Sequence, residues 1–143
     1  MNEEPEAVKG REKVLIVEDD ADIREMYQRV LERAGYEVAM ATNGRDGLEK
    51  AIGERPDLVL LDIVFLPPEP EQPDGFAVLA SIRTEPATQG IPVIVLTGPR
   101  DDPTHVKRGM ELGATAYLVK HQTGPKKVLE VCQEALKGKA GEK

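Results

Sequence analysis

The chain has 143 residues, of which 40% are hydrophobic and 31% are charged, and this is enough for one ordinary domain with a substantial core. Its net charge of -7 and its pI near 4.9 disfavour direct binding to a nucleic-acid backbone, which depends on Lys and Arg. The single cysteine, Cys132, allows no intramolecular disulfide, and its helical spacing among Val and Leu residues predicts a small core residue. A polar, acidic start and the lack of a long apolar run predict a cytoplasmic protein without membrane contact.

Both ends of the chain are rich in Glu, Lys and Gly and poor in apolar residues. We therefore expect disordered tails at 1–10 and 138–143. Residues 11–137 are expected to form the single domain, with no second domain attached.

Five short apolar runs alternate with segments of helical periodicity. The runs predict strands at 13–17, 37–41, 57–61, 92–96 and 115–119. The helical segments follow Asp20 as far as Gly35, span about 45–53 and 75–84, open at Asp102-Pro103 with an N-cap and a proline, and run from about 125 to 137. This alternation predicts an α/β fold, a doubly wound, mostly parallel sheet with helices on both faces.

The order of the strands follows from their polarity. The runs 57–61 and 92–96 lack polar alternation, as expected for central parallel strands, whereas 37–41 is more polar and is expected near an edge. With right-handed crossovers, the order 2-1-3-4-5 is favoured, and the topological switch point then lies between the first and third strands.

Polar residues that phosphate chemistry could use follow four of these runs: Glu18-Asp19, Asp62, Thr97 and Lys120. Ligands of such sheets bind outside the carboxyl ends of the strands, where these side chains would meet. Each also has an ordinary explanation, since acids favour helix N-termini, Thr ends turns and Lys is often solvated. Asp62 fits an ordinary explanation least, because an ionised side chain at the end of a buried strand is costly unless it is paired.

Three carboxylates at one edge would repel one another and raise their pKa values unless a cation joined them. Mg²⁺ suits such a site, since it binds one or two carboxylates and keeps several waters. The residues alone therefore predict Mg²⁺ at the acidic edge formed by Glu18, Asp19 and Asp62.

Five motifs, in order, resemble the receiver domain of bacterial two-component response regulators over about residues 11–137. They are VLIVEDD at 14–20, PDLVLLD at 56–62, DGF at 74–76, PVIVLTG at 92–98 and GATAYLVK at 113–120. The resemblance implies a flavodoxin-like receiver fold with five helices, in a single-domain protein of the chemotaxis type.

The resemblance also implies a role for each acidic residue. Asp62 would be the phosphoacceptor and a Mg²⁺ ligand, and Asp19 would bind Mg²⁺ directly. Glu18 would act on the metal through water, and the backbone carbonyl of Val64 would be a further ligand.

Three more residues would act on the phosphoryl group. Thr97 would hydrogen-bond it, Lys120 would contact it, and the rotamer of Tyr117 would report activation. The donor would be a phosphohistidine of a sensor histidine kinase or phosphotransfer protein. The signal would pass by protein contact, through the face formed by the fourth helix, fifth strand and fifth helix, and the chain would catalyse only its own phosphorylation and dephosphorylation.

The sequence departs from the family pattern in three places. Eleven residues, 63 to 73, separate Asp62 from the Asp-Gly pair, and four of them are prolines, where the family has a shorter turn. His121 follows Lys120 where the family usually has proline, and the loop after Thr97 is one residue longer than is common.

Other functions fit the sequence less well. A pseudo-receiver that only binds proteins would commonly have lost Asp62, Lys120 or an acid. A phosphohydrolase of the haloacid-dehalogenase kind, with an Asp nucleophile and Mg²⁺, needs a second Asp where Val64 stands. A flavin carrier of the flavodoxin type needs a Gly- and hydroxyl-rich phosphate loop where the acids follow the first strand.

Overall fold

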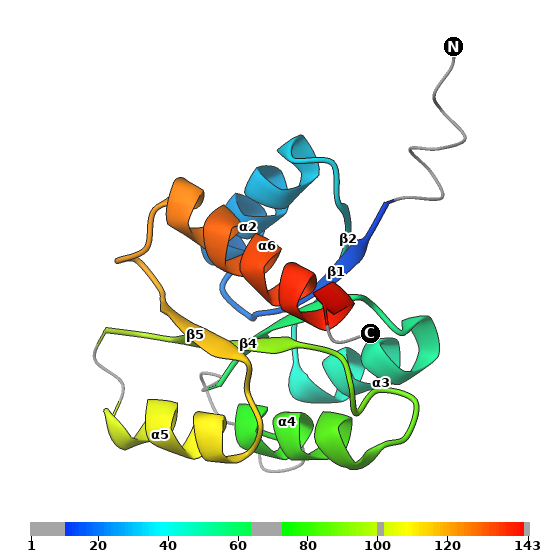
Figure 1. The fold of residues 1–143 in the computed structure, drawn as a ribbon. Helices are drawn as coiled ribbons and strands as arrows, with labels where there is room; N and C mark the ends of the chain where they lie inside the picture. Colours follow the sequence, from blue (N-terminus) through cyan, green and yellow to red (C-terminus); the bar gives the residue numbers. More distant parts are fainter. Residues whose placement is uncertain (1–10, 64–72, 100–101, 142–143) are drawn as a thin grey trace.

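A parallel sheet forms the centre of the fold (Figure 1). The computed structural model describes residues 11–63, 73–99 and 102–141. Within these ranges the strands lie in the predicted order, β2-β1-β3-β4-β5, and each neighbouring pair is parallel. They are β1 (Lys13–Val17), β2 (Glu37–Ala41), β3 (Leu58–Asp62), β4 (Val93–Thr97) and β5 (Ala116–Val119).

The last three strands begin one residue later than predicted. Pro92 precedes β4 because proline has no N–H for a strand ladder. Asp57 precedes β3, and its carboxylate accepts a hydrogen bond from the backbone N–H of Lys13 at 2.8 Å. The third and fourth strands also end one residue later than predicted, β3 on Asp62 and β4 on Thr97. Each of these polar side chains therefore belongs to the last residue of its strand.

Helices cover both faces of the sheet (Figure 1). α2 and α6 lie on one face, and α3, α4 and α5 lie on the other. Their bounds are α2 (Ala21–Arg33), α3 (Gly44–Glu54), α4 (Gly75–Thr84), α5 (Thr104–Glu111) and α6 (Pro125–Gly141). The side chains of Asp20, Asn43 and Asp74 accept hydrogen bonds from N–H groups in the first turns of α2, α3 and α4, which fixes where these helices begin.

Two helices differ from the prediction at one end. α5 begins only at Thr104, although Asp102 still accepts hydrogen bonds from the backbone N–H and the hydroxyl of Thr104 at 3.0 and 2.9 Å. α6 continues to Gly141, so part of the tail expected at 138–143 is helical backbone. The tail was expected from a composition rich in Glu, Lys and Gly, but the buried Ala135 and Leu136 hold the preceding turn of α6 against the core. The tail expected at 1–10 lies outside the described residues.

Successive side chains of a strand point to opposite faces of the sheet, so each face carries its own apolar layer. Val14 and Ile16 of β1 pack under α2 and α6, while Leu15 and Val17 pack under the other three helices. All five residues of β3 and of β4 are buried, and β2 lies at one edge, as predicted. Cys132 is buried in the α2 and α6 layer, which confirms its place in the core.

The same alternation decides on which side of the sheet each polar residue emerges. Glu18, Asp62 and Lys120 continue the rows of side chains that face α2 and α6. Thr97 continues the row of Val93 and Val95, which face the opposite layer. Of the helices that the structure describes, none has both the length and the apolar character that crossing a bilayer requires.

Candidate functional site

Three carboxylates meet where β1 and β3 end. Glu18, Asp19 and Asp62 each offer an oxygen that lies within 4.8 Å of the others. Glu18 and Asp62 are almost completely buried, with 0% and 1% of their surface exposed, while Asp19 is half-buried. The sequence predicted that these three acids would meet at the carboxyl edge of the sheet, and the structure brings them together there.

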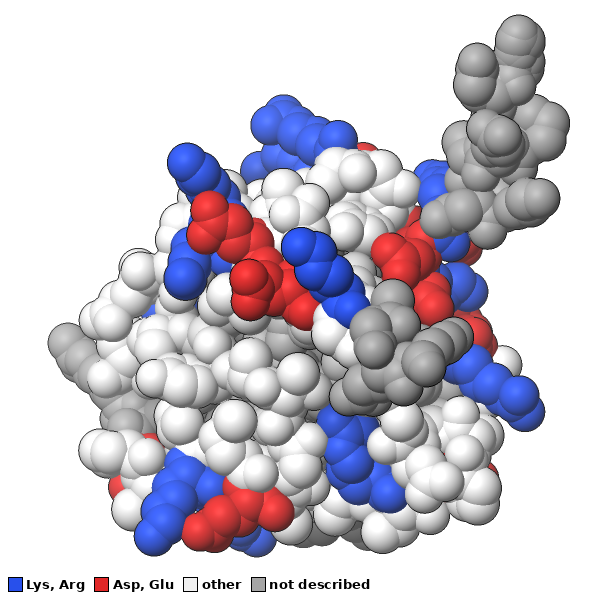
Figure 2. Space-filling model, in the orientation of Figure 1, with Lys and Arg blue, Asp and Glu red and all other residues white. Residues whose placement is uncertain are grey.

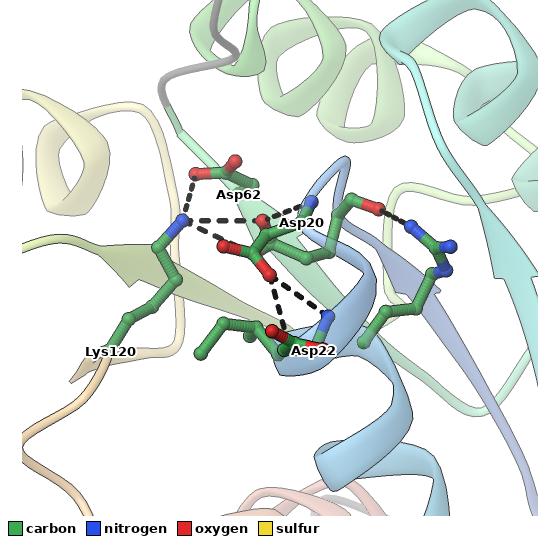
Figure 3. A network of polar contacts seen from close by, with 7 residues as sticks. Asp20, Asp22, Asp62 and Lys120 are labelled. Carbon is green, nitrogen blue, oxygen red and sulfur yellow. Dashed lines mark hydrogen bonds and ion pairs between the residues drawn. The ribbon is translucent and has the colours of Figure 1, made fainter.

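Lys120 supplies a positive charge to this acidic group. Its Nζ lies 3.3 Å from Oδ1 of Asp62 and 3.3 Å from each carboxylate oxygen of Glu18. Figure 3 shows the Lys120 side chain extending from the end of β5 with its amine directed at Asp62. One ammonium therefore bridges two buried acids that come from different strands.

Burial and charge act in opposite directions on these groups. Burial raises the pKa of the Glu18 carboxyl, and Lys120 and the backbone N–H of Asp20 counteract part of this effect. Burial also lowers the pKa of Lys120, but the charges of Asp62 and Glu18 outweigh it and leave that pKa above its usual value. Lys120 is therefore a stable cation at neutral pH.

The backbone around Glu18 is held by residues whose role the sequence analysis missed. Nη1 of Arg24 donates a hydrogen bond to the Glu18 carbonyl at 2.9 Å, and the Asp20 N–H donates to Oε2 of Glu18 at 3.1 Å. Asp20 also caps α2, so the first turn of that helix and the acidic pair form one unit (Figure 3). An Arg four residues after a helix N-cap was the available signal.

Thr97 ends β4, the strand that pairs with β3, and Tyr117 lies on β5, the edge strand beyond β4. Thr97 is 4% exposed, and its hydroxyl donates a hydrogen bond to the Gly98 carbonyl at 3.2 Å. The backbone carbonyl of Thr97 accepts a 2.7 Å hydrogen bond from the backbone N–H of Lys120, and this bond ties the ends of β4 and β5 together. Tyr117 is 47% exposed, so its ring faces solvent.

The turn after Lys120 has an unusual backbone. His121 adopts a φ of 67°, in the left-handed region that favours glycine. The carbonyl of Val119 accepts hydrogen bonds from the N–H of Gln122 and the hydroxyl of Thr123, at 3.2 and 2.8 Å. Proline, the usual residue here in the family pattern, cannot adopt this φ.

Gly75 packs directly against the end of β3. A Cβ at this position would lie 2.5 Å from the Asp62 carbonyl oxygen and 2.5 Å from the Cα of Ile63. The Asp-Gly pair therefore brings α4 close behind the candidate acceptor. Val64, whose carbonyl was expected to bind metal, and most of the proline-rich segment lie outside the described residues.

The donor set suits a hard divalent cation. Its atoms are carboxylate oxygens, which Mg²⁺ and Ca²⁺ prefer. Three carboxylates and one ammonium leave net negative charge in a largely buried position, which a cation would compensate. The acidic group formed by Glu18, Asp19 and Asp62 could therefore hold a metal ion.

Comparison with known proteins agrees with this geometry. Residues 14–132 match the family model of the response regulator receiver domain. The transcriptional regulatory protein AfsQ1 of Streptomyces coelicolor is 42% identical over 111 residues, which cover 78% of this chain and 45% of that protein. The alkaline phosphatase synthesis transcriptional regulatory protein PhoP of Bacillus subtilis is 38% identical over 108 residues, covering 76% of this chain and 42% of that protein.

Solved structures give the same result. The chemotaxis response regulator CheY4 of Vibrio cholerae matches with a TM-score of 0.76 and 31% identity, over 87% of this chain and 98% of that chain. A CheY-like receiver domain protein of Methanospirillum hungatei matches with a TM-score of 0.79 and 29% identity, over 93% and 99% of the two chains. The chain thus spans less than half of the curated transcriptional regulators but nearly all of these two structures. With the acidic group and Lys120 at the carboxyl edge of a 2-1-3-4-5 sheet, the chain belongs to the response regulator receiver domain family.

Proposed function

We propose that this protein is a phosphorylation-controlled switch in which Asp62 accepts a phosphoryl group from the phosphohistidine of a sensor histidine kinase or phosphotransfer protein. The observation that supports this most strongly is the position of Asp62. It is a buried carboxylate at the end of a central strand, beside two further acids and 3.3 Å from the ammonium of Lys120.

The transfer exchanges one bond for another. A carboxylate oxygen of Asp62 attacks the phosphorus in line, the O–P bond forms as the N–P bond of the phosphohistidine breaks, and the freed imidazole takes up a proton. Such a transfer depends mainly on positioning and on charge compensation at the phosphoryl oxygens. Lys120 is held at the site as a cation and supplies part of this compensation.

Mg²⁺ would be held by the carboxylates of Asp19 and Asp62, with Glu18 acting through water and the Val64 carbonyl as a further ligand. When bound, it would neutralise charge between the acceptor and the incoming phosphoryl group. The residues fit this role because their oxygens converge within 4.8 Å in a net negative site.

Thr97 and Tyr117 would convert phosphorylation into a change of surface. The Thr97 hydroxyl, now bonded to the Gly98 carbonyl, would turn to the phosphoryl group, and the exposed Tyr117 ring would then turn inward. We propose that the surface altered in this way is the face of α5, β5 and α6.

The charge distribution supports a partner site on that face. Charged side chains gather over α6 and along α5, and the middle of the face is largely uncharged (Figure 2). Met110 and Tyr117, on α5 and β5, are large hydrophobic residues with 41% and 47% of their surface exposed. An apolar centre with a charged rim is typical of protein-binding surfaces.

The proposed role is signalling by protein contact in the cytoplasm, without direct binding to nucleic acid and without catalysis on other substrates. The curated relatives are named as transcriptional regulators, and one solved neighbour is named as a chemotaxis regulator. The net charge of -7 favours a protein partner over a nucleic-acid backbone for this chain.

Incubation with acetyl phosphate and Mg²⁺, followed by intact mass measurement, tests the acceptor. The wild-type protein should gain the mass of one phosphate, and Asp62→Asn should gain none. Asp22→Asn, which changes an exposed acid in the first turn of α2, is the matched control and should label like the wild type. A wild-type protein that stays unlabelled would indicate a protein-binding module without phosphotransfer.

A further inference from the structure

Tyr27 is a buried polar residue in the apolar layer under α2 and α6, it interacts electrostatically with Glu18 and Asp62, and the phosphotransfer chemistry gives it no role. It lies in the second turn of α2 and has no exposed surface. Its ring packs in the same apolar layer as Ile16 and Leu60, the residues that precede Glu18 and Asp62 on the same side of the sheet. Helical side chains lean toward the helix N-terminus, so the long Tyr27 side chain is directed back to the carboxyl edge of the sheet.

The hydroxyl of Tyr27 has no hydrogen-bond partner among the residues that the structure describes. A buried hydroxyl without a partner is unfavourable, and phenylalanine would fill the same space without this cost. Burial, and after it the charges of Glu18 and Asp62, raises the pKa of Tyr27, so the group keeps its proton and remains a donor.

Glu18 is the group that would need such a donor. In this structure its buried carboxylate is compensated by Lys120, at 3.3 Å from both oxygens, and by the Asp20 N–H at 3.1 Å. Lys120 is shared with Asp62, and a phosphoryl group on Asp62 would draw the ammonium away from Glu18. Mg²⁺ would act on Glu18 only through water, so a buried carboxylate that loses its direct ion pair with Lys120 is destabilised unless another donor replaces the ammonium.

We propose that Tyr27 is a positioning residue for Glu18, whose hydroxyl donates a hydrogen bond to the Glu18 carboxylate when Lys120 leaves it for the phosphoryl group on Asp62. The proposal rests on the proposed function for the event that moves Lys120. The hydroxyl then has no partner in the resting state because its partner is available only in the active one. Tyr27 would lower the cost of moving Lys120 and so favour the phosphorylated form.

A double-mutant cycle in the unphosphorylated protein tests this directly. Lys120→Met removes the ammonium permanently, so Glu18 should turn to Tyr27. In that background, Tyr27→Phe should lower the folding equilibrium constant about tenfold at mildly alkaline pH, as expected for a lost hydrogen bond to a charged group. In the wild-type background, Tyr27→Phe should leave that constant unchanged or raise it, because the hydroxyl has no partner there.

Two further measurements separate this role from packing. Tyr36→Phe is the matched control, since Tyr36 is bonded to Gln133 in the same layer and should show no coupling to Lys120→Met. The pKa of the Glu18 carboxyl, followed by NMR in the Lys120→Met background, should rise further when Tyr27 becomes Phe.

The outcomes are distinct. Effects of Tyr27→Phe that agree within about twofold in the two backgrounds would be additive and would overturn the proposal. The cycle needs no phosphorylation, so it decides the role of Tyr27 even if acetyl phosphate never labels Asp62. With Lys120 intact and Asp62 phosphorylated, Tyr27→Phe should lower the free energy of unfolding by more than it does in the unphosphorylated protein.

Discussion

Gly75 controls how closely α4 approaches the acceptor carboxylate. We expect Gly75→Ala to destabilise the protein by about 1–3 kcal/mol, the usual cost of overpacking. The new Cβ would meet the Asp62 carbonyl oxygen and the Ile63 Cα, both at 2.5 Å, and neither backbone atom can move without shifting β3. Urea unfolding measures the loss, and acetyl-phosphate labelling should slow as the carboxylate is displaced.

Gly53→Ala is the control for this prediction. Gly53 also lies in a helix, but a Cβ there would meet nothing within 4 Å. The change should be neutral or stabilising by up to about 1 kcal/mol, because alanine favours helix. Equal effects of the two substitutions would contradict the role assigned to Gly75.

His121 stores backbone strain next to Lys120. We expect His121→Gly to stabilise the protein by about 1 kcal/mol, since glycine adopts the left-handed conformation without the penalty that a side chain carries. His121→Pro should destabilise it, because proline fixes φ near −65° and the observed φ is 67°. Gln122→Gly, at a neighbour without a positive φ, should show no gain in the same unfolding measurements. A stable His121→Pro variant would mean that the turn can adopt a second conformation.

At the scale of elements, Lys50 protects the open edge of the sheet. Its Nζ donates to the Met40 carbonyl of β2 at 2.6 Å and lies 3.6 Å from Asp46. The Ala41 carbonyl accepts a hydrogen bond from the N–H of Glu18, directly after β1, and because carbonyls alternate along a strand, that of Met40 points to the open edge. Lys50 therefore occupies an acceptor that another strand could use.

We expect Lys50→Met to cost about 1 kcal/mol of stability and to promote association through β2. Light scattering at increasing protein concentration measures the association. Lys107→Met is the control, because the Lys107 side chain is 78% exposed on α5 and, among the described residues, pairs with Glu111 at 4.0 Å. If the two variants associate equally, a general loss of charge explains the effect better than edge pairing does.

At the scale of the whole molecule, local signals in the sequence were sufficient for the sheet. The apolar runs and their polarity predicted the strand order, and positions after strand ends predicted that Glu18, Asp62 and Lys120 would meet. The boundaries were less predictable, because the polar composition after residue 137 predicted a tail where α6 continues to Gly141.

How the buried charges are compensated within that edge was less predictable. The sequence placed Glu18, Asp62 and Lys120 together, but nothing in it showed that one ammonium would bond both acids, one of them 102 positions away. The left-handed backbone of His121 had no signal either, since neither glycine nor asparagine marks it. The orphaned hydroxyl of Tyr27 depends on the packing of α2 against the sheet, which helical periodicity shows only as a buried position.

The stability of the whole fold should fall at alkaline pH because of groups buried between α2, α6 and the sheet. Burial raises the pKa of the Cys132 thiol from 9.0 to about 12, so above pH 9 the unfolded chain loses a proton that the folded protein keeps. The free energy of unfolding should then decrease with rising pH, by up to about 1.4 kcal/mol per pH unit for this one group. Cys132→Ala should lower stability at neutral pH through lost packing but should make the alkaline slope shallower. Urea unfolding at a series of pH values above 9 compares the two slopes, and equal slopes would show that Cys132 does not contribute to the pH dependence.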